Sequence, residues 1–433
     1  MPTTATAAPN PIPANETTVR RRLAQMVMIG FALRVGFVLI AHTYRFKASG
    51  GNFGFGYEMG HIAASLASGN GFADPFQAYT GPTAWEPPLY PFLIAAVFRL
   101  TGIYSATSSI ILLAINSFFS ALTSIPVFYL AKRSFGERVA TWSAWTWALC
   151  PYAMYWAVKW VWETSIAAFL LTVLLLMAWR LADGAPAREW IAWGLLWGIA
   201  ALLNPSLLSV LPFVGLWVAY RRYREQQPFF ARAIVASLMF FAVIAPWLMR
   251  NYETFHRPVF LRTNFCAELR FGNGPGANGL SMGFQQHPTH NPAELERYKQ
   301  MGELAYVAEK KAEAIAWIRA NPLAFVQVSI ARFIYYWTDT PWSGRLMPAK
   351  NALFLASSLC GFGGLWLMWK QRRPGFFLFA VCLLIFPLVY YFVFPHPRYR
   401  APIEPQLFTL IVFLISQAKE LTTPTAPPPP AYS

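Results

Sequence analysis

Residues 57–91 read YEMGHIAASLASGNGFADPFQAYTGPTAWEPPLYP and separate the first two long apolar segments of the chain. Read as a helix, the first part has an apolar face with the spacing i, i+3, i+4, i+7: Met59, Ile62, Ala63 and Leu66. The opposite face is polar: Glu58, His61, Ser65 and Ser68. A short helix of this kind lies flat on a membrane surface, with its polar face toward a protein cavity or water. Gly69 and Gly71 predict its end.

A second apolar piece follows the polar spacer. Pro87 and Pro88 begin the segment LYPFLIAAVFRL, and Gly102 ends it. At about 1.5 Å per residue, this helix is too short to cross a hydrocarbon core of about 30 Å. The sequence therefore predicts a second juxtamembrane helix or a tilted entry segment.

The composition predicts an α-helical polytopic membrane protein. Of the 433 residues, 56% are hydrophobic and only 12% are charged, whereas soluble proteins have about 25% charged residues. The apolar runs are continuous, which excludes the alternating strands of a β-barrel. The net charge of +16 is best explained by positively charged cytoplasmic loops and not by nucleic-acid binding.

The apolar segments predict 10–11 transmembrane helices, with juxtamembrane helices in the first outer loop. Residues 23–249 form the first transmembrane module, with a first outer loop at 44–104. A large outer loop spans 250–321, and 322–418 hold the C-terminal helices. We expect disordered tails at 1–22 and 419–433, which are rich in Pro, Thr and Ala. Arg20 to Arg22 place the N-terminus in the cytoplasm.

Three features leave alternatives open. Arg34 lies inside the first span, where it faces the helix bundle or a wet cavity, or extends to the interface. The pair Asn204-Pro205 breaks two spans at 190–220. The segment 322–340 either crosses the membrane or does not, which decides the side of the C-terminus.

Two acids on outer turns, Glu58 and Glu163, are the candidate catalytic residues. One would be a general base for an acceptor hydroxyl or amine, and the other would orient the acceptor or hold a divalent cation. The simpler interpretation is two solvated loop acids. Glu86 contacts a phosphate only through a metal, or is itself a solvated loop acid. We expect four residues to line the cavity: His61, Glu86, Tyr90 and Tyr399.

Arginines near the outer loops are candidates for binding a phosphate. Arg398 and Arg400 belong to HPRYR before the last span, and Arg250 and Arg270 flank the second outer loop. All four can equally anchor the protein to lipid headgroups. His287 and His290 could chelate a metal only weakly. The motif GNGPGANG lacks the features of a phosphate-binding loop.

These motifs, in this order, resemble the GT-C-fold glycosyltransferases that use polyprenyl-phosphate sugars. The family includes the protein O-mannosyltransferases and the lipid A aminoarabinose transferase. Glu58 matches their first acidic position, where aspartate is commoner, and Glu163 matches the second. PWLMRNYETF and HPRYRAPIEPQL resemble later motifs of bacterial members. Glu86 stands where the aminoarabinose transferase type has a lysine. The lack of an Asp at the first acidic site leaves metal use open.

The resemblance implies an inverting glycosyltransferase at the outer face of a bacterial cytoplasmic membrane. Its partners would be a polyprenyl-phosphate sugar donor, a lipid, glycan or protein acceptor, and membrane lipids, with no nucleic acid. No cofactor is required, although a divalent cation is possible. The alternative is a flippase or transporter of a lipid-linked or anionic substrate, supported by Arg34 and the broken helices. The absence of an internal inverted repeat argues against it.

Overall fold

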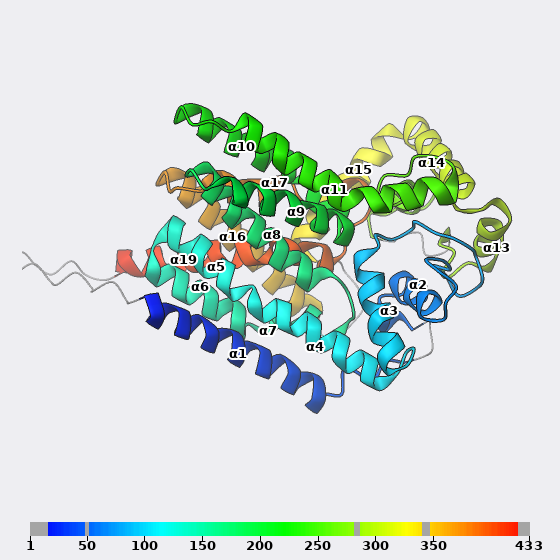
Figure 1. The fold of residues 1–433 in the computed structure, drawn as a ribbon, viewed down its shortest axis with the longest axis horizontal. Coiled ribbons are helices and arrows are strands. Elements are labelled where there is room, and N and C mark those ends of the chain that lie inside the picture. Colours follow the sequence, from blue (N-terminus) through cyan, green and yellow to red (C-terminus); the bar gives the residue numbers. More distant parts are fainter. Residues whose placement is uncertain (1–15, 48–51, 281–285, 340–346, 423–433) are drawn as a thin grey trace, which may run out of the picture.

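A computed structural model describes residues 16–47, 52–280, 286–339 and 347–422. The described chain is helical throughout, with one isolated β-bridge between Ala73 and Pro82. Figure 1 shows long helices packed side by side, with a cluster of shorter helices at one end. This arrangement confirms the predicted all-α membrane fold.

Five helical segments in the described residues are long and apolar enough to cross a membrane. They are α1 (Glu16–Ile40), α4 with α5 (Ala106–Leu122 and Ser124–Phe135), α8 (Thr164–Ala182), α11 (Phe230–Phe255) and α16 (Met347–Lys370). A sixth is possible if α14 (Glu303–Ala320) and α15 (Pro322–Thr338), which meet at 105°, form one broken span. By length and hydropathy, the count is thus lower than the 10–11 spans predicted.

The difference arises because several apolar segments are divided into short helices. They are α6 (Glu137–Leu149) and α7 (Pro151–Lys159), α9 (Ala187–Leu203) and α10 (Leu211–Arg224), and α17 (Phe376–Leu384) and α18 (Leu388–Phe392). A proline lies at each break, where it cannot continue a helical hydrogen-bond ladder. The break at Asn204-Pro205 is as predicted, and a short 3-10 helix, η2 (Pro205–Ser209), follows it.

The short helices at one end come from the predicted outer loops. Figure 1 labels four of them: α2 (Glu58–Ala67), α3 (Leu89–Thr101), α13 (Pro292–Met301) and α14. The others are η1 (Phe53–Phe55) and α12 (Phe265–Gly272). The chain after Asn291 forms two helices, α13 and α14, because Gly302 adopts a φ of +74° between them. Asn291 caps α13, since its side chain accepts from the backbone N–H groups of Ala293 and Glu294.

The opposite end collects the basic turns. Asp183 forms ion pairs with Arg133 at 3.0 Å and with Arg221 at 3.7 Å, and Gln371 donates to Gln417. The two ends of the described chain also lie at this end (Figure 1). The last helix there is α19 (Glu404–Thr422), preceded by the 3-10 segment η4 (Pro397–Ile403).

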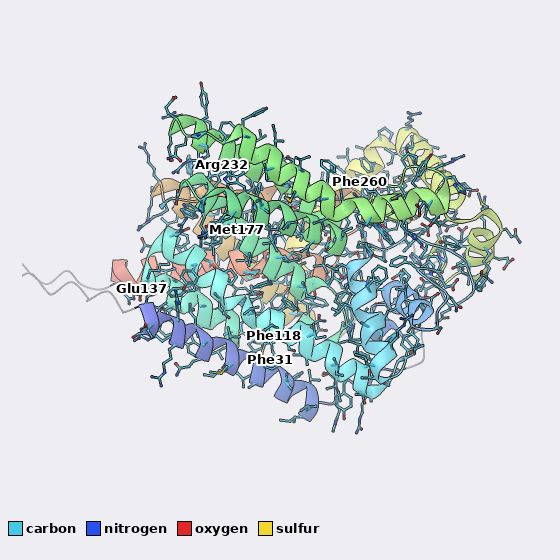
Figure 2. All side chains as sticks on the ribbon, in the orientation of Figure 1. Phe31, Phe118, Glu137, Met177, Arg232 and Phe260 are labelled. Atoms are coloured by element: carbon cyan, nitrogen blue, oxygen red, sulfur yellow. The ribbon has the colours of Figure 1, made fainter. Side chains whose placement is uncertain are left out.

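The predicted tails are shorter than expected. α1 begins at Glu16 and not at residue 23, so the Arg20–Arg22 cluster is helical, and α19 extends to Thr422. Residues 1–15 and 423–433 lie outside the described residues, so the disorder predicted for them stays a prediction. Phe31 of α1 contacts Phe118 of α4 edge to face, with 6.0 Å between ring centroids (Figure 2).

Arg34 faces the bundle and does not extend to the interface. Its side chain is fully buried and donates to the carbonyls of Gly30 and Ala148, both at 2.8 Å, and to the hydroxyl of Ser120 at 3.1 Å. These acceptors satisfy the guanidinium at membrane depth, where an unpaired charge is costly. Arg34 therefore joins α1 to α4 and α6.

Candidate functional site

Two adjoining cavities lie at the end that carries the short helices. The first, called here the polar cavity, has a volume of about 100 Å³ and is lined by four acids and two arginines: Glu58, Glu86, Glu163, Glu268, Arg262 and Arg398. The second, called the aromatic cavity, has a volume of about 660 Å³. Four residues line both cavities and form their junction: Glu58, Trp162, Phe394 and Arg398.

Glu58 and Glu163 meet because the turns that carry them pack together. The N–H of Val161 donates to the carbonyl of Gly54 at 2.9 Å. A side chain at Gly56 (φ +83°) would meet the carbonyl oxygen of Val161 at 2.7 Å, so glycine is required at this close approach. The next residue, Tyr57, has a φ of +40°, which is strained for a non-glycine residue. This turn places Glu58 as the first residue of α2.

Glu163 directly precedes α8 and is 7% exposed. Its Oε1 accepts a hydrogen bond of 3.1 Å from the side-chain amide of Asn204, while its Oε2 is buried without a hydrogen-bond partner. The helix break at Asn204-Pro205 therefore serves the site, because it presents that amide. Burial is the main reason why the pKa of Glu163 is raised to about 7.

Glu58 lies among the other acids. Its pKa is raised to about 8, mainly by burial and in smaller part by the nearby carboxylates of Glu86 and Glu268, against the opposing effect of Arg398. Burial also raises the pKa of Glu268 to about 7 and raises the pKa of Glu86. Acids grouped in this way cannot all be charged at neutral pH. The interpretation of Glu86 as a solvated loop acid is wrong, since this residue is 8% exposed.

His287 approaches Glu58 from the large outer loop. The backbone N–H of Thr289 donates to its Nδ1 at 3.1 Å, which assigns the proton of the neutral ring to Nε2. That Nε2 lies 3.7 Å from Oε1 of Glu58. Burial lowers the pKa of His287 to about 3, so the ring is neutral at physiological pH and presents an N–H to Glu58.

Arg398 is the cation at the junction of the cavities. Its guanidinium carbon lies 3.7 Å from the centroid of the Trp162 ring, and one terminal nitrogen donates to the Tyr399 hydroxyl at 3.4 Å. Its Nε is buried without a hydrogen-bond partner. The second arginine, Arg262, lies 3.8 Å from Glu86. The cavity thus holds a guanidinium with donor capacity to spare.

The other predicted phosphate-binding arginines do not line either cavity. Arg400 is buried in an ion pair with Glu404 and donates to Ser358 at 2.7 Å. Arg250 donates to the carbonyl of Thr83 at 2.6 Å and stacks near Trp247. Arg270 pairs with Glu313 at 2.7 Å. Their contacts hold segments of the protein together.

Two of the four predicted cavity-lining residues, Glu86 and Tyr399, line the polar cavity. His61 packs against the rings of Tyr57 and Tyr104, and the Tyr90 hydroxyl donates to Asn116 at 3.0 Å, so both lie beside the site. Glu268 was not among the predicted site residues. It could have been predicted, because it is an acid within the short apolar helix α12.

The described residues contain no group of three or more His, Cys, Asp or Glu side chains arranged to hold a metal ion. Carboxylate oxygens are the ligands that hard divalent cations prefer. Glu58, Glu86, Glu163 and Glu268 supply that chemistry without forming such a group. A divalent cation therefore stays a proposal.

Both the sequence and the fold of this chain are similar to those of known proteins. Residues 85–249 match the family model described as dolichyl-phosphate-mannose-protein mannosyltransferase. No curated protein matched the sequence. The oligosaccharyltransferase AglB from Archaeoglobus fulgidus, solved with an inhibitory peptide and a dolichol-phosphate, aligns with a TM-score of 0.53 at 15% identity. That alignment covers 93% of this chain and 50% of AglB.

The same archaeal enzyme in its apo form aligns with a TM-score of 0.53 at 14% identity, over 94% of this chain and 51% of that one. ArnT from Cupriavidus metallidurans bound to undecaprenyl phosphate aligns at 11% identity with a TM-score of 0.41, over 94% and 79% of the two chains. The present chain thus spans about half the length of the archaeal oligosaccharyltransferase.

The fold and the family match define the class of protein. The structure is that of a multi-pass membrane protein of the GT-C type, which confirms the resemblance seen in the sequence. Residues 85–249 match the model of the dolichyl-phosphate-mannose-protein mannosyltransferase family, and the fold of the chain is similar to that of the archaeal oligosaccharyltransferase.

Proposed function

We propose that this protein is an inverting glycosyltransferase that moves a sugar from a polyprenyl-phosphate donor to an acceptor hydroxyl or amine. The observation that carries the proposal is Glu58, a carboxyl with a pKa of about 8 at the junction of two cavities and beside Arg398. A general base works best with a pKa near the working pH. The polar cavity is the proposed donor site.

In the proposed reaction, the acceptor oxygen or nitrogen attacks the anomeric carbon from the face opposite the phosphate. The bond between the anomeric carbon and the phosphate oxygen breaks, so the configuration inverts. Glu58 takes the proton of the acceptor, and the electron pair of the broken bond leaves on a polyprenyl phosphate monoester. Glu163, held by Asn204, is proposed to orient the acceptor.

The arginines stabilise the charge that develops on the leaving phosphate. Arg398 is the first candidate because its Nε has no protein partner and its guanidinium plane is fixed by stacking on Trp162. Arg262 replaces Arg400, Arg250 and Arg270 as the second candidate, because it lines the polar cavity. Two apolar residues of that cavity, Leu203 and Val389, offer a surface for the first part of the lipid.

The proposed location is a bacterial cytoplasmic membrane with the active site facing outward. The basic turns that end α5 and α10 lie at the opposite end of the molecule from α2 and α13 (Figure 1). Loops rich in Lys and Arg remain on the cytoplasmic side. The cavities would therefore open on the outer face.

The decisive experiment compares wild type with Glu58→Gln on a panel of polyprenyl-phosphate sugars, read by mass spectrometry. We expect wild type to consume one donor and Glu58→Gln to be about 10²–10⁴-fold slower. Glu296→Gln, on the exposed face of α13, is the matched control. Addition of EDTA or Mg²⁺ tests the divalent cation. Unchanged turnover by Glu58→Gln would remove Glu58 from the mechanism.

The two sequence features that supported a flippase or transporter have other roles in this structure. Arg34 is satisfied by carbonyl groups inside the bundle, and the break at Asn204-Pro205 supplies a hydrogen bond to Glu163. Turnover in detergent, where no sealed bilayer exists, separates the two functions.

A further inference from the structure

The proposed reaction leaves the aromatic cavity without an occupant. We propose that it binds a carbohydrate ring of the acceptor, so that the acceptor is a glycan or a glycolipid. This inference rests on the proposed function, because it assigns the second substrate of the same site. It follows from the chemistry of the lining, the arrangement of the rings and the position of the cavity beside Glu58.

The lining of the aromatic cavity is composed of flat rings and polar groups. Eight of its lining residues are Phe, Tyr or Trp: Phe53, Tyr57, Tyr152, Tyr155, Trp156, Trp160, Trp162 and Phe394. Among the described lining residues, none is Leu, Ile, Val, Met or Ala. A polyprenyl chain is accommodated by aliphatic side chains, whereas the C–H faces of a sugar ring stack on aromatic faces.

Another cavity shows the contrast within the same molecule. It has a volume of about 570 Å³ and lies between α9, α10 and α11. Its lining includes Leu211, Leu216 and Val218, and the described residues around it carry no charged side chain. Six aromatic residues also line this cavity: Trp190, Trp193, Trp197, Phe229, Phe240 and Phe241. The aromatic cavity differs from it in having charged side chains and no Leu, Ile, Val, Met or Ala among its described lining residues.

The rings form a row of surfaces with Trp160 at its centre. The Trp160 centroid lies 5.4 Å from that of Trp156, 6.2 Å from that of Trp162 and 6.0 Å from that of His396. The interplanar angles of these three pairs are 60°, 47° and 36°, whereas the Phe53 ring meets Trp160 edge to face at 5.3 Å. Such tilted faces present broad apolar surface at low cost in side-chain entropy.

Hydroxyl groups of a sugar need hydrogen-bond partners, and the cavity provides them. The indole Nε1 of Trp156 is buried without a partner. An ion pair of 2.7 Å between Lys350 and Asp339 lines the same cavity. Both donors and acceptors are thus present beside the rings, as a molecule with many hydroxyl groups requires.

The position of the cavity connects binding to the chemistry. Because Glu58 and Arg398 line both cavities, a sugar ring in the aromatic cavity has its hydroxyl groups within reach of Glu58. The acceptor O–H gives its proton to Glu58, and the oxygen forms the new bond to the anomeric carbon of the donor. One cavity then serves each substrate, and the base lies between them.

The test measures binding, independently of turnover. The full chain in detergent is mixed with methyl glycosides of a hexose, a hexosamine, a deoxyhexose and a heptose at millimolar concentration. Saturation-transfer NMR reports ring C–H protons in contact with the protein. We expect at least one glycoside to bind wild type and to bind Trp160→Leu about tenfold more weakly, because the aromatic face is lost.

Matched variants distinguish a specific loss of binding from a loss of folding. Trp160→Phe keeps an aromatic face and should retain binding. Trp142→Leu changes a tryptophan that is 61% exposed elsewhere and should bind as wild type does. Tyr155→Leu changes a lining ring that is 40% exposed and removes little packing, so it should fold and bind more weakly.

The inference is overturned if no glycoside contacts wild type, or if the Trp160→Leu protein binds glycosides as strongly as wild type does. It is also overturned if Trp160→Leu instead loses binding of farnesyl phosphate or of a Ser/Thr-containing peptide. Donor consumption is measured separately on the same preparations. Consumption of a donor without glycoside binding overturns only this inference. Glycoside binding without consumption of any donor overturns only the proposed function.

Discussion

At the scale of single residues, the site depends on carboxyl groups whose charge is suppressed by burial. Glu58 and Glu163 have raised pKa values of about 8 and about 7, so a large part of each population is protonated at neutral pH. This explains how four acids can line one small cavity with only two arginines. If Glu58 is the base, as proposed, it must lose its proton before it can accept one from the acceptor.

The first prediction concerns pH. Because only deprotonated Glu58 accepts a proton, kcat/KM for sugar transfer should rise with pH and level off above about 8. Glu86 raises the pKa of Glu58 through its negative charge. The variant Glu86→Gln should therefore move this rise to lower pH. The measurement is a pH profile of donor consumption, with Glu296→Gln as the control. A rise centred near pH 4.5 would contradict the assignment.

The second prediction concerns Arg398. Lysine keeps the positive charge but loses the planar fork and the stacking on Trp162. We expect Arg398→Ala to lower kcat/KM about 10²–10³-fold, and Arg398→Lys to recover only part of it. Steady-state kinetics with varied donor measure this, and Arg257→Ala, at an exposed position after α11, is the control. Full activity of Arg398→Lys would show that charge alone suffices.

At the scale of elements, the two outer regions are joined through one buried carboxylate. Glu303, the first residue of α14, accepts from the backbone N–H of Ala84 at 2.8 Å and from the hydroxyls of Thr263 and Tyr298, both at 2.7 Å. It also accepts from the hydroxyl of Thr83. The segment before Glu86 is thereby fixed to the large outer loop.

The third prediction follows from this connection. Glu303→Ala leaves several buried donors without an acceptor and should destabilise the protein by about 2–4 kcal/mol. Glu303→Gln, which keeps one acceptor oxygen, should be less harmful. Thermal unfolding in detergent measures the difference, and Glu296→Ala is the control. An unchanged midpoint for Glu303→Ala would show that the two regions are held together by other contacts.

The sequence predicted the elements of the site better than their contacts. Glu58 and Glu163 were found because acids are scarce on the outer turns, and the break at Asn204-Pro205 was found because proline ends a helix. The burial of Glu86 could not be found this way. Glu86 is enclosed together with residues of α12 and η4, which line the same cavity and lie far away in the sequence.

The two arginines of η4 also show what the sequence could not predict. Arg398 and Arg400 are two residues apart in η4, yet the first lines both cavities and the second pairs with Glu404 inside the protein. Spacing alone does not decide which side chain faces a cavity, because that depends on the orientation of a short 3-10 segment. Composition and hydropathy predicted the membrane fold, but they overestimated the number of full-length spans.

At the scale of the whole molecule, charge is separated along the axis of the bundle. Basic turns gather at one end, where Asp183 pairs with Arg133 and Arg221. The acids that line the polar cavity include Glu58 of α2 and Glu268 of α12. Figure 1 shows α2 at the other end of the molecule. The bend of 105° between α14 and α15 lets the chain change direction between these regions.

The fourth prediction concerns this polarity. Because Gln371 and Gln417 are hydrogen-bonded at the basic end, both turns should face the cytoplasm together with the start of α1. A cysteine placed at Gln371 should react with an impermeant maleimide only after the cells are opened. A cysteine at Asn70, just after α2, should react in intact cells. A background in which Cys150, Cys266, Cys360 and Cys382 are replaced by serine supplies the control. Labelling of both sites from outside would mean that α15 crosses the membrane and reverses the C-terminal helices.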